Sequence, residues 1–331
     1  MGDLFIDLAA GGSALQASDE YLNPAGRLLE PADPVPDAGR PGARGAWLDG
    51  WETRRRREPG HEWVIIRMGR RGLLERLVVD TTHVTTSLPA ACSVEAVDLP
   101  GDPGLVDLVR NRSLWREVVA RTPVRGGGPH SFAGDHIPAT HLRLVIYPDG
   151  GVARFRAYGD PLPPADLASR DRVDLASLDN GARVVAASDA RTSSPNLMLL
   201  PGDPRHHRDG WVTRRRREPG FEWAIIRLGG AGFPTQVTVD TRHFPGDSPD
   251  RVAVLGAVAG GRSPDGIAEA DWRSILEPTE VTADSRNRFD LPPGTGPVTH
   301  LRLELHPDGA VARFRAHGTA LGGWLDEDPS G

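Results

Sequence analysis

Two short stretches of the chain are apolar at nearly every position. Residues 63–68 read Trp-Val-Ile-Ile-Arg-Met, and residues 223–228 read Trp-Ala-Ile-Ile-Arg-Leu. Short runs of this kind predict β-strands that are covered on both faces. Further strands are expected at 76–80 and 236–240, and each of them delivers an aspartate at its end.

A Pro-Asp-Gly-Gly turn lies between two more predicted strands, 142–146 and 152–158. Asp-Gly is a strong hairpin signal, so we expect a hairpin with a two-residue loop at Asp149–Gly150. This register pairs Leu144 with Phe155 on an apolar face that should lie on the core.

The same register places two arginines, Arg143 and Arg156, opposite each other, and in the second copy Arg302 opposite Arg315. Like charges directly opposite each other are unfavourable. The pairing therefore implies acidic partners or an anion bound between the arginines. The alternative is a salt bridge to a carboxylate of the same repeat, such as Asp80, or a well-solvated face.

Turn residues and short strands dominate the rest of the chain. Glycine and proline are abundant, with 39 and 30 residues, which favours many turns over long helices. Weak helical patterns occur only at 113–121 and 269–276. The pattern predicts an all-β protein made of β-sandwiches.

The chain contains a long internal repeat. Residues 49–69 return as residues 209–229 with only four differences among 21 positions, one of which is Glu52 against Val212. Thr-His-Leu-Arg-Leu occurs at 140–144 and again at 299–303. Each copy is therefore a whole domain. A proline-rich linker places the boundary near residue 160 and predicts repeats at 1–160 and 161–331.

Composition limits the classes of function. The 331 residues carry a formal net charge of -6, which argues against a general nucleic-acid binder. All 39 basic residues of the Lys and Arg class are arginines, so Schiff-base chemistry and a Walker-type phosphate loop are excluded. Cys92 is the single cysteine, and no membrane-spanning run or signal peptide is evident. A cytoplasmic location is the expectation.

The arginine run at 54–57 is the strongest candidate for binding. In an extended segment Arg54 and Arg56 point to one side and the two neighbouring arginines to the other. A guanidinium pair flanked by Asp49 and Glu52 can hold a small molecule that has one carboxylate and adjacent amide groups. The alternative is a basic surface run held by salt bridges, and a third reading is a recent duplication that has not diverged.

Histidines offer possible acid-base groups. His83 and His243 align just after the two strands that end in aspartate, and His141 and His300 align inside another strand. A structural role is the alternative for each of them. No His-x-His, Cys-x-x-Cys or His-Glu-x-x-His spacing occurs, so the sequence names no metal ligands and leaves a divalent metal cofactor open.

At this point the motifs resemble a known family. Asp49-Gly-Trp-Glu-Thr-Arg-Arg, Pro59-Gly-His-Glu-Trp and Tyr147-Pro-Asp-Gly-Gly-Val-Ala-Arg are similar to motifs of the allantoicases, and the resemblance extends from Asp7 to Gly318. It implies two jelly-roll β-sandwich repeats of the galactose-binding or discoidin type. It also implies homo-oligomers and hydrolysis of allantoate to ureidoglycolate and urea in purine breakdown.

Allantoate has one carboxylate and two ureido groups, which suit arginine forks and carboxylate acceptors. We expect acid-base catalysis without a covalent intermediate, with Glu52 as base or orienter and His83 and His243 as alternates. The expected substrate-binding residues are Asp49, Trp51, Arg54, Arg56, Asp209, Trp211, Arg214, Arg216, Arg143 and Arg302.

The sequence leaves the number of active sites open. The chain could have a single site made by both repeats, two sites, or one active and one degenerate site. The competing classes are a non-catalytic ligand- or sugar-binding tandem sandwich and an inactive paralogue.

Overall fold

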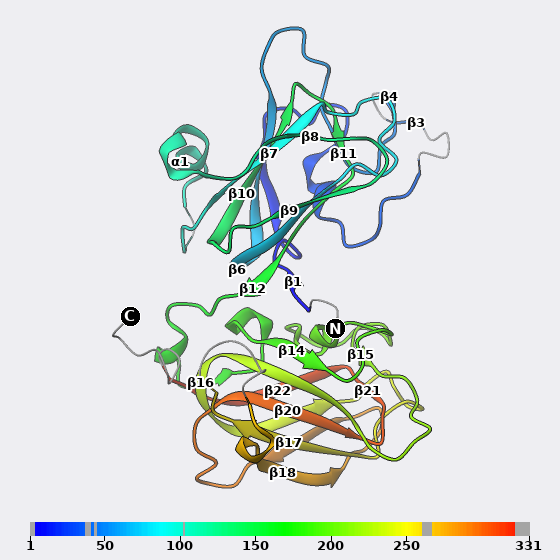
Figure 1. Ribbon diagram of the computed structural model, residues 1–331, viewed down its shortest axis with the longest axis vertical. Helices are drawn as coiled ribbons and strands as arrows, with labels where there is room; N and C mark the ends of the chain where they lie inside the picture. Colours follow the sequence, from blue (N-terminus) through cyan, green and yellow to red (C-terminus); the bar gives the residue numbers. More distant parts are fainter. Residues whose placement is uncertain (1–3, 37–40, 43–44, 102, 260–266, 322–331) are drawn as a thin grey trace. The chain divides into compact units, whose positions relative to one another are not determined.

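The computed structural model describes residues 4–36, 41–42, 45–101, 103–259 and 267–321 (Figure 1). The chain forms two compact units, one of residues 5–160 and one that begins at Pro161 and includes Leu4. The ends of the two predicted repeats, residues 1–3 and 322–331, lie outside the described residues. We keep the assignment of 1–160 and 161–331 to two repeats as a proposal.

Both units are built almost entirely from strands. The first contains β1 (Ile6–Asp7), β2 (Ser13–Ala17), β3 (Pro41–Gly42), β4 (Gly45–Ala46), β5 (Trp51–Glu52), β6 (Glu62–Asp80), β7 (Ala91–Val97), β8 (Arg116–Pro123), β9 (Pro129–Ala133), β10 (Pro138–Tyr147), β11 (Gly151–Val152) and β12 (Arg154–Pro161). The second contains β13 (Val173–Asp174), β14 (Arg183–Ala187), β15 (Trp211–Val212), β16 (Glu222–Asp240), β17 (Arg251–Ala257), β18 (Arg273–Glu280), β19 (Arg286–Asp290), β20 (Val298–His306), β21 (Ala310–Val311) and β22 (Arg313–Ala320). The prediction of an all-β protein with two β-sandwich repeats is confirmed.

One long strand organises each unit. The first part of β6 pairs with β2 and β10, and its last five residues pair with β9. In the second unit, β16 pairs with β14 and β20 in its first part and with β19 and β22 in its last part. Each long strand therefore contributes to both layers of its sandwich. The strands predicted at 63–68 and 76–80 are the two ends of β6, and those at 223–228 and 236–240 are the two ends of β16.

A glycine in each long strand allows another segment to approach closely. A Cβ atom on Gly69 would lie 2.0 Å from the Ala10 carbonyl oxygen, and one on Gly229 would lie 1.8 Å from that of Asn180. Any larger residue would push these segments apart, which explains why both copies have glycine here.

The two faces of β6 are both covered, as the apolar run predicted. Ile65 packs with Val97 and Leu108 in a cluster on the outer face. Leu108 belongs to α1 (Leu105–Arg110), a short helix that the sequence analysis missed and that Figure 1 shows beside β7 and β10. Val64 and Ile66, which alternate with Ile65 along the strand and point to the opposite face, are fully buried.

The predicted hairpin at Asp149–Gly150 is wrong. Strand β10 pairs with β6 and β7, whereas β12 lies between β1 and β6 in the sheet. The segment just after the turn forms β11, which pairs with β5. The turn therefore carries the chain from one layer to the other instead of joining two neighbouring strands.

The opposed arginine pairs are wrong for the same reason. Arg143 lies opposite Ile65 and Glu95. Arg302 lies opposite Ile225 and Leu255. No repulsion between facing arginines has to be relieved in this register.

The helices predicted at 113–121 and 269–276 are also wrong. Each region begins with a short 3-10 turn, Arg112–Leu114 or Glu269–Asp271, and continues as the strand β8 or β18. The register of both strands shifts twice against their neighbours. Such irregularities interrupt the alternation of apolar and polar residues that is typical of a strand. The spacing of apolar residues in these segments therefore resembled that of a weak helix.

Candidate functional site

Three neighbouring strands of the second repeat form a polar platform. Asp240, Thr238 and Gln236 of β16 lie opposite Arg313, Arg315 and His317 of β22. On the other side, Asp240 and Thr238 lie opposite Arg286 and Arg288 of β19. Alternate residues of a strand point to the same face. Phe314 and Ala316 point into the core, so the polar side chains between them lie together on the opposite face.

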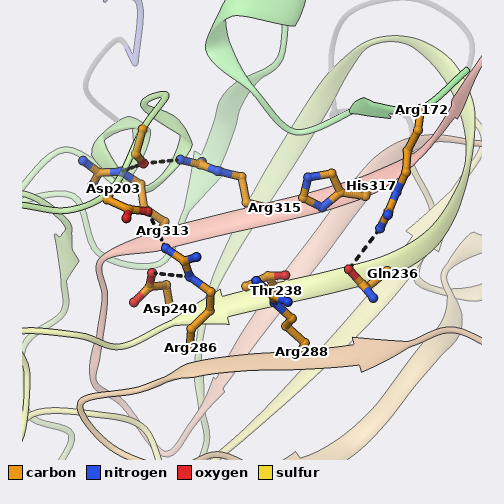
Figure 2. A pocket seen from close by; sticks show the side chains of 11 residues that line it. Arg172, Asp203, Gln236, Thr238, Asp240, Arg286, Arg288, Arg313, Arg315 and His317 are labelled. Atoms are coloured by element: carbon orange, nitrogen blue, oxygen red, sulfur yellow. Dashed lines mark hydrogen bonds and ion pairs between the residues drawn. The ribbon is translucent and has the colours of Figure 1, made fainter. Parts of the chain in front are cut away.

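The platform is the floor of a cavity of about 490 Å³, a volume that suits a small ligand. It is lined by Arg172, Gly202, Asp203, Gln236, Thr238, Asp240, Arg286, Arg288, Arg313, Arg315 and His317. Figure 2 shows these side chains, with His317 between Arg315 and Arg172. Five arginines stand against two aspartates, so the cavity suits an anion.

Two of the arginines are fixed by the fold. Arg313 is buried, and it forms an ion pair of 2.9 Å with Asp209. Arg315 donates to the carbonyl oxygens of Leu200 and Gly202 and lies 3.3 Å from a carboxylate oxygen of Asp174. These contacts hold the loop that forms one wall of the cavity.

Arg286 is held by the acidic side of the cavity. Its guanidinium contacts Asp240 at 3.3 Å and also pairs with Asp203. Burial acts to raise the pKa of Asp240, but hydrogen bonds from Arg242 and Arg286 outweigh it and hold that pKa below its usual value. Asp240 is therefore an ionised acceptor for arginine.

Other groups in the cavity keep free hydrogen-bonding capacity. In the described part of the chain, Arg288 and the Thr238 hydroxyl have no hydrogen-bond or ion-pair partner, and the buried Nδ1 atom of His317 has no hydrogen-bond partner. Arg172 uses one nitrogen on the side-chain oxygen of Gln236, at 3.0 Å. Burial lowers the pKa of His317, and Arg172, Arg315 and Arg288 lower it further, while Asp174 opposes the shift. The imidazole is therefore neutral near pH 7.

The corresponding face of the first repeat has different chemistry. Tyr158 occupies the place of His317, and the guanidinium of Arg76 lies over its ring at 4.3 Å from the centroid. Val78 pairs with Ser131 where the second repeat has Thr238 and Arg288. The two repeats share their backbone register here but not their polar groups.

The predicted binding residues Asp49 and Asp209 are buried and serve as structural anchors. Asp49 forms an ion pair of 2.7 Å with Arg154 and one of 3.2 Å with Arg27. Burial raises the pKa of Asp49, but Arg154 outweighs that effect and leaves the pKa below its usual value. Asp209 pairs with Arg313 in the same way.

The repeated block brings two predicted residues to the loop of Asp19 and a third to Glu62 at the start of β6. The indole Nε1 of Trp51 donates to the Asp19 carbonyl oxygen at 2.8 Å, and the Arg54 guanidinium contacts the Asp19 carboxylate at 2.8 Å. Arg56 pairs with Glu62 at 2.6 Å. These contacts fit the alternative that salt bridges hold the arginines. The role of these residues in binding substrate stays a prediction.

The second repeat duplicates this arrangement. Trp211 donates to the Asp189 carbonyl oxygen at 2.8 Å, and Arg214 pairs with the Asp189 carboxylate at 3.1 Å. Arg216 pairs with Glu222 at 2.8 Å. In each copy the serine before the aspartate donates to the glutamate, as Ser18 does to Glu62. The near-identity of the two blocks thus preserves a network of charged hydrogen bonds.

The predicted base Glu52 lies in β5 and is buried. Its Oε2 atom accepts a hydrogen bond of 2.8 Å from the side-chain amide of Asn23. In the second repeat Val212 takes its place, and its backbone N–H donates to the Ser193 hydroxyl at 2.8 Å. A carboxylate and its amide partner are therefore confined to the first repeat at this position.

The predicted alternates His83 and His243 occupy equivalent, exposed positions after the long strands. Both adopt a left-handed backbone conformation, with φ of 66° and 71°. Histidine tolerates this conformation better than most residues, but it is uncommon and is found in turns and at functional sites. The His243 ring lies 3.1 Å from the Pro204 carbonyl oxygen.

The predicted binding residues Arg143 and Arg302 are held by glutamates. Arg143 is buried, with its guanidinium 3.3 Å from Glu95 and 5.0 Å from the centroid of the Trp63 ring. Arg302 pairs with Glu304 at 2.9 Å and with Glu269 at 2.8 Å. The acidic partners expected from the sequence exist, but they come from neighbouring strands and loops.

Among the residues that the structure describes, no group of three or more His, Cys, Asp or Glu side chains is arranged to hold a metal ion. The need for a cofactor therefore stays open. No helix in the described part of the chain is long and apolar enough to cross a membrane.

Comparison with known proteins decides the family. The model of the allantoicase repeat matches residues 3–162 and again residues 173–321. The chain belongs to the allantoicase family. Its resemblance to that family at the level of motifs is confirmed.

Relatives in this family cover nearly the whole chain. A probable allantoicase from Burkholderia mallei is 40% identical over 95% of this chain and 94% of its own length. One from Rhizobium meliloti is 38% identical over 95% and 93%. The crystal structure of allantoicase from Saccharomyces cerevisiae has a TM-score of 0.76 and 32% identity, and the match covers 96% of this chain and 93% of that one.

Sequence reasoning placed Arg315 beside a possible bound anion, but opposite the wrong arginine, and it missed Arg172, Arg286, Arg288 and His317. His317 and Tyr158 occupy matching places in two otherwise similar segments, so the substitution was visible in the sequence. Arg286 and Arg288 were not, because the first repeat has Pro129 and Ser131 there and little similarity around them. Only the strand register brings these residues together.

Proposed function

We propose that this protein hydrolyses allantoate to ureidoglycolate and urea, as part of purine breakdown by way of allantoin. The observation that carries the proposal is the similarity to probable allantoicases along about 95% of the chain. A match of this extent includes both repeats. The match to a solved allantoicase agrees with it.

For the chemistry, we propose acid-base catalysis by side chains without a covalent enzyme intermediate. Glu52 is the first choice for the base or orienter, and His83 and His243 are the alternates. The support for Glu52 is its burial beside Asn23 and its replacement by Val212 in the second repeat. A carboxylate at hydrogen-bonding distance from a water can remove its proton as the water oxygen bonds to the central carbon of allantoate. The bond from that carbon to one ureido nitrogen breaks, and this nitrogen takes up a proton, so that one ureido group leaves as urea and the central carbon carries the new hydroxyl of ureidoglycolate.

For substrate binding, we propose that arginines hold the carboxylate of allantoate and that acidic groups accept its ureido N–H bonds. The repeated block is suited to this in its composition. Its candidates are Asp49, Trp51, Arg54 and Arg56, with Asp209, Trp211, Arg214 and Arg216 in the second repeat and Arg143 and Arg302 on the strands. Because these arginines have carboxylate partners in the structure, binding through them requires an exchange of partners.

The test is urea release from allantoate by the purified full-length protein. Release should be saturable and should accompany formation of ureidoglycolate in equal amount. The assay is repeated after chelation and again with added manganese. Release that survives chelation supports side-chain catalysis, and release that depends on metal supports a divalent cofactor.

The competing function is a tandem module that binds a small ligand or sugar without turnover. The fold permits it, because β-sandwiches of many functions share this architecture. Its mark would be saturable binding with no urea formed in any metal condition. A protein that neither binds nor hydrolyses allantoate would be an inactive paralogue.

We also propose that the protein is cytoplasmic and forms homo-oligomers. The single cysteine agrees with a reducing compartment. The oligomer is implied by the family resemblance. Cell fractionation and light scattering after size-exclusion chromatography test these two points.

A further inference from the structure

The polar cavity on the second repeat is built to bind an anion, and the catalytic proposal above does not use it. We propose that this cavity, in place of the repeated block, recognises the carboxylate of the substrate and that it exists once per chain, on the second repeat. In that case the candidate base is His243 of the same repeat and not Glu52 of the first. This inference rests on the proposed function. Its ligand class is a small organic carboxylate that carries ureido or amide groups.

The first argument is the charge that is left over in the cavity. The two aspartates that line it, Asp203 and Asp240, both contact Arg286. Arg288 shares the platform but has no ion pair with the described residues, and Arg172 has only the amide oxygen of Gln236. Two guanidinium groups thus face the cavity without a carboxylate partner in the described structure. A guanidinium in this state can bind a carboxylate through two parallel hydrogen bonds.

The second argument is the set of neutral polar groups beside these arginines. The buried Nδ1 atom of His317 has no hydrogen-bond partner among the described residues. An unpaired buried polar atom is costly, so it indicates a missing partner such as a ligand or water. Thr238 adds a hydroxyl between the arginine-bearing strands, opposite both Arg288 and Arg315. A neutral imidazole and a hydroxyl are suited to the N–H and carbonyl groups of a ureido substituent.

The third argument is the contrast with the first repeat. There Arg76 stacks on Tyr158, which takes the place of His317. Val78 and Ser131 replace Thr238 and Arg288 at the same register. The first repeat therefore has no guanidinium at the place of Arg288 and no hydroxyl at the place of Thr238, although Ser131 and Tyr158 carry hydroxyls elsewhere on this face. Since the backbone pairing is the same, the difference comes from the side chains and not from the fold.

The fourth argument is the rigidity of the walls. Arg313 and Arg315 bind carbonyl oxygens of the 3-10 segment Pro195–Leu199 and of the residues that follow it. Asp240 holds Arg286 and Arg242 on the opposite side. A ligand would therefore meet groups that are already in place, which lowers the cost of ordering them on binding.

The test compares two matched positions in steady-state urea release from allantoate. Arg288→Gln removes the charge from an exposed side chain, and it should raise KM at least about tenfold with little change in kcat, because the arginine binds the ground state and transition state alike. Ser131→Ala at the equivalent place in the first repeat is the control and should leave both constants unchanged. Thermal unfolding midpoints of both variants should equal that of the wild type.

A second pair of variants tests the neutral groups. His317→Gln keeps a hydrogen-bonding group, whereas His317→Tyr installs the residue of the first repeat. The proposal requires that the tyrosine variant lose affinity and that the glutamine variant keep a larger part of it. Equal loss in both, together with a lower unfolding midpoint, would show that His317 acts only in packing.

Binding of N-carbamoylglycine, a carboxylate with one ureido group, separates this proposal from the proposed function. It is measured by calorimetry on the wild type and on Arg288→Gln. Binding that depends on Arg288 supports the site even if the protein releases no urea, in which case the proposed function alone fails. Normal urea release with an unchanged KM in Arg288→Gln overturns the site and leaves the function standing. If the protein neither releases urea nor binds N-carbamoylglycine, both the proposed function and the proposed site are overturned.

Discussion

The Arg154 guanidinium and the Asp49 carboxylate form a buried ion pair, with Nη2 and Oδ2 2.7 Å apart. Only 4% of the Arg154 side chain and 10% of the Asp49 side chain are exposed. Arg154 also donates to the carbonyl oxygens of Asp49 and Ala32. The pair therefore ties the segment before β5 to the strand β12, and Arg313 with Asp209 does the same in the second repeat.

Replacing Asp49 by alanine should destabilise the first repeat strongly. It leaves the Arg154 charge buried without its carboxylate, and breaking a buried pair in this way costs about 3 kcal/mol or more. Guanidinium unfolding followed by tryptophan fluorescence measures the change. Asp166→Ala is the control, because its pair with Arg170 is exposed and such pairs contribute little. Equal stability of the two variants would contradict the structural role of Asp49.

The strands that form the core were predictable, because a strand that is buried on both faces needs apolar residues at nearly every position. The apolar runs at 63–68 and 223–228 lie in β6 and β16, as expected. The pairing of strands was not predictable, because the Asp149–Gly150 turn has the composition of a hairpin but joins two layers. A turn motif in the sequence predicts only that the chain reverses direction there. Which strands pair depends on distant segments such as β7 and β9.

Burial of His300 should make stability depend on pH. Burial and the nearby Arg227 lower the pKa of His300 to about 4. In the unfolded chain its pKa is about 6.5, so between these values the unfolded state binds a proton that the native state does not. The contribution of neutral His300 to the free energy of unfolding is therefore complete above about pH 6.5. It falls by up to about 3 kcal/mol as the pH drops toward 4.

The measurement is denaturant unfolding at a series of pH values from 4 to 7.5. His300→Gln should remove this contribution, so its stability difference from the wild type should shrink as the pH falls. His207→Gln changes an exposed histidine and leaves His300 in place, so it should keep the wild-type dependence. A constant difference between His300→Gln and the wild type at all pH values would refute the assignment.

The single thiol should be inert in the native protein. Cys92 is fully buried in β7, and burial raises its pKa to about 11. The thiolate is the reactive form, so a native thiol of this kind reacts slowly even at pH 8. An aromatic disulfide reagent should modify no thiol in the folded protein and one per chain in guanidinium. Rapid modification under native conditions would show that the strand opens locally.

The candidate site was only partly readable from the sequence. The repeated arginine block stands out because its identities are kept, and the structure shows these arginines paired with Asp19, Glu62 and their equivalents. The cavity on the second repeat takes Arg313 and Arg315 from a repeated motif, but its unpaired groups lie where the copies differ, because Thr238, Arg288 and His317 stand in place of Val78, Ser131 and Tyr158. Arg288 and His317 are brought together only by the pairing of β19, β16 and β22.

Glu52 differs from its repeat counterpart in a way that activity can test. Glu52→Gln removes the negative charge but keeps a side chain that can bond to Asn23, now 2.8 Å from the carboxylate. If Glu52 is the base, kcat for urea release should fall by about 100-fold or more, with an unchanged unfolding midpoint. Asn23→Ser, which introduces the serine found at Ser193, is the companion variant and should lower kcat less, because the carboxylate remains. Full turnover in Glu52→Gln would remove Glu52 from the chemistry and move the search to His83 and His243, where His→Gln variants provide the same comparison.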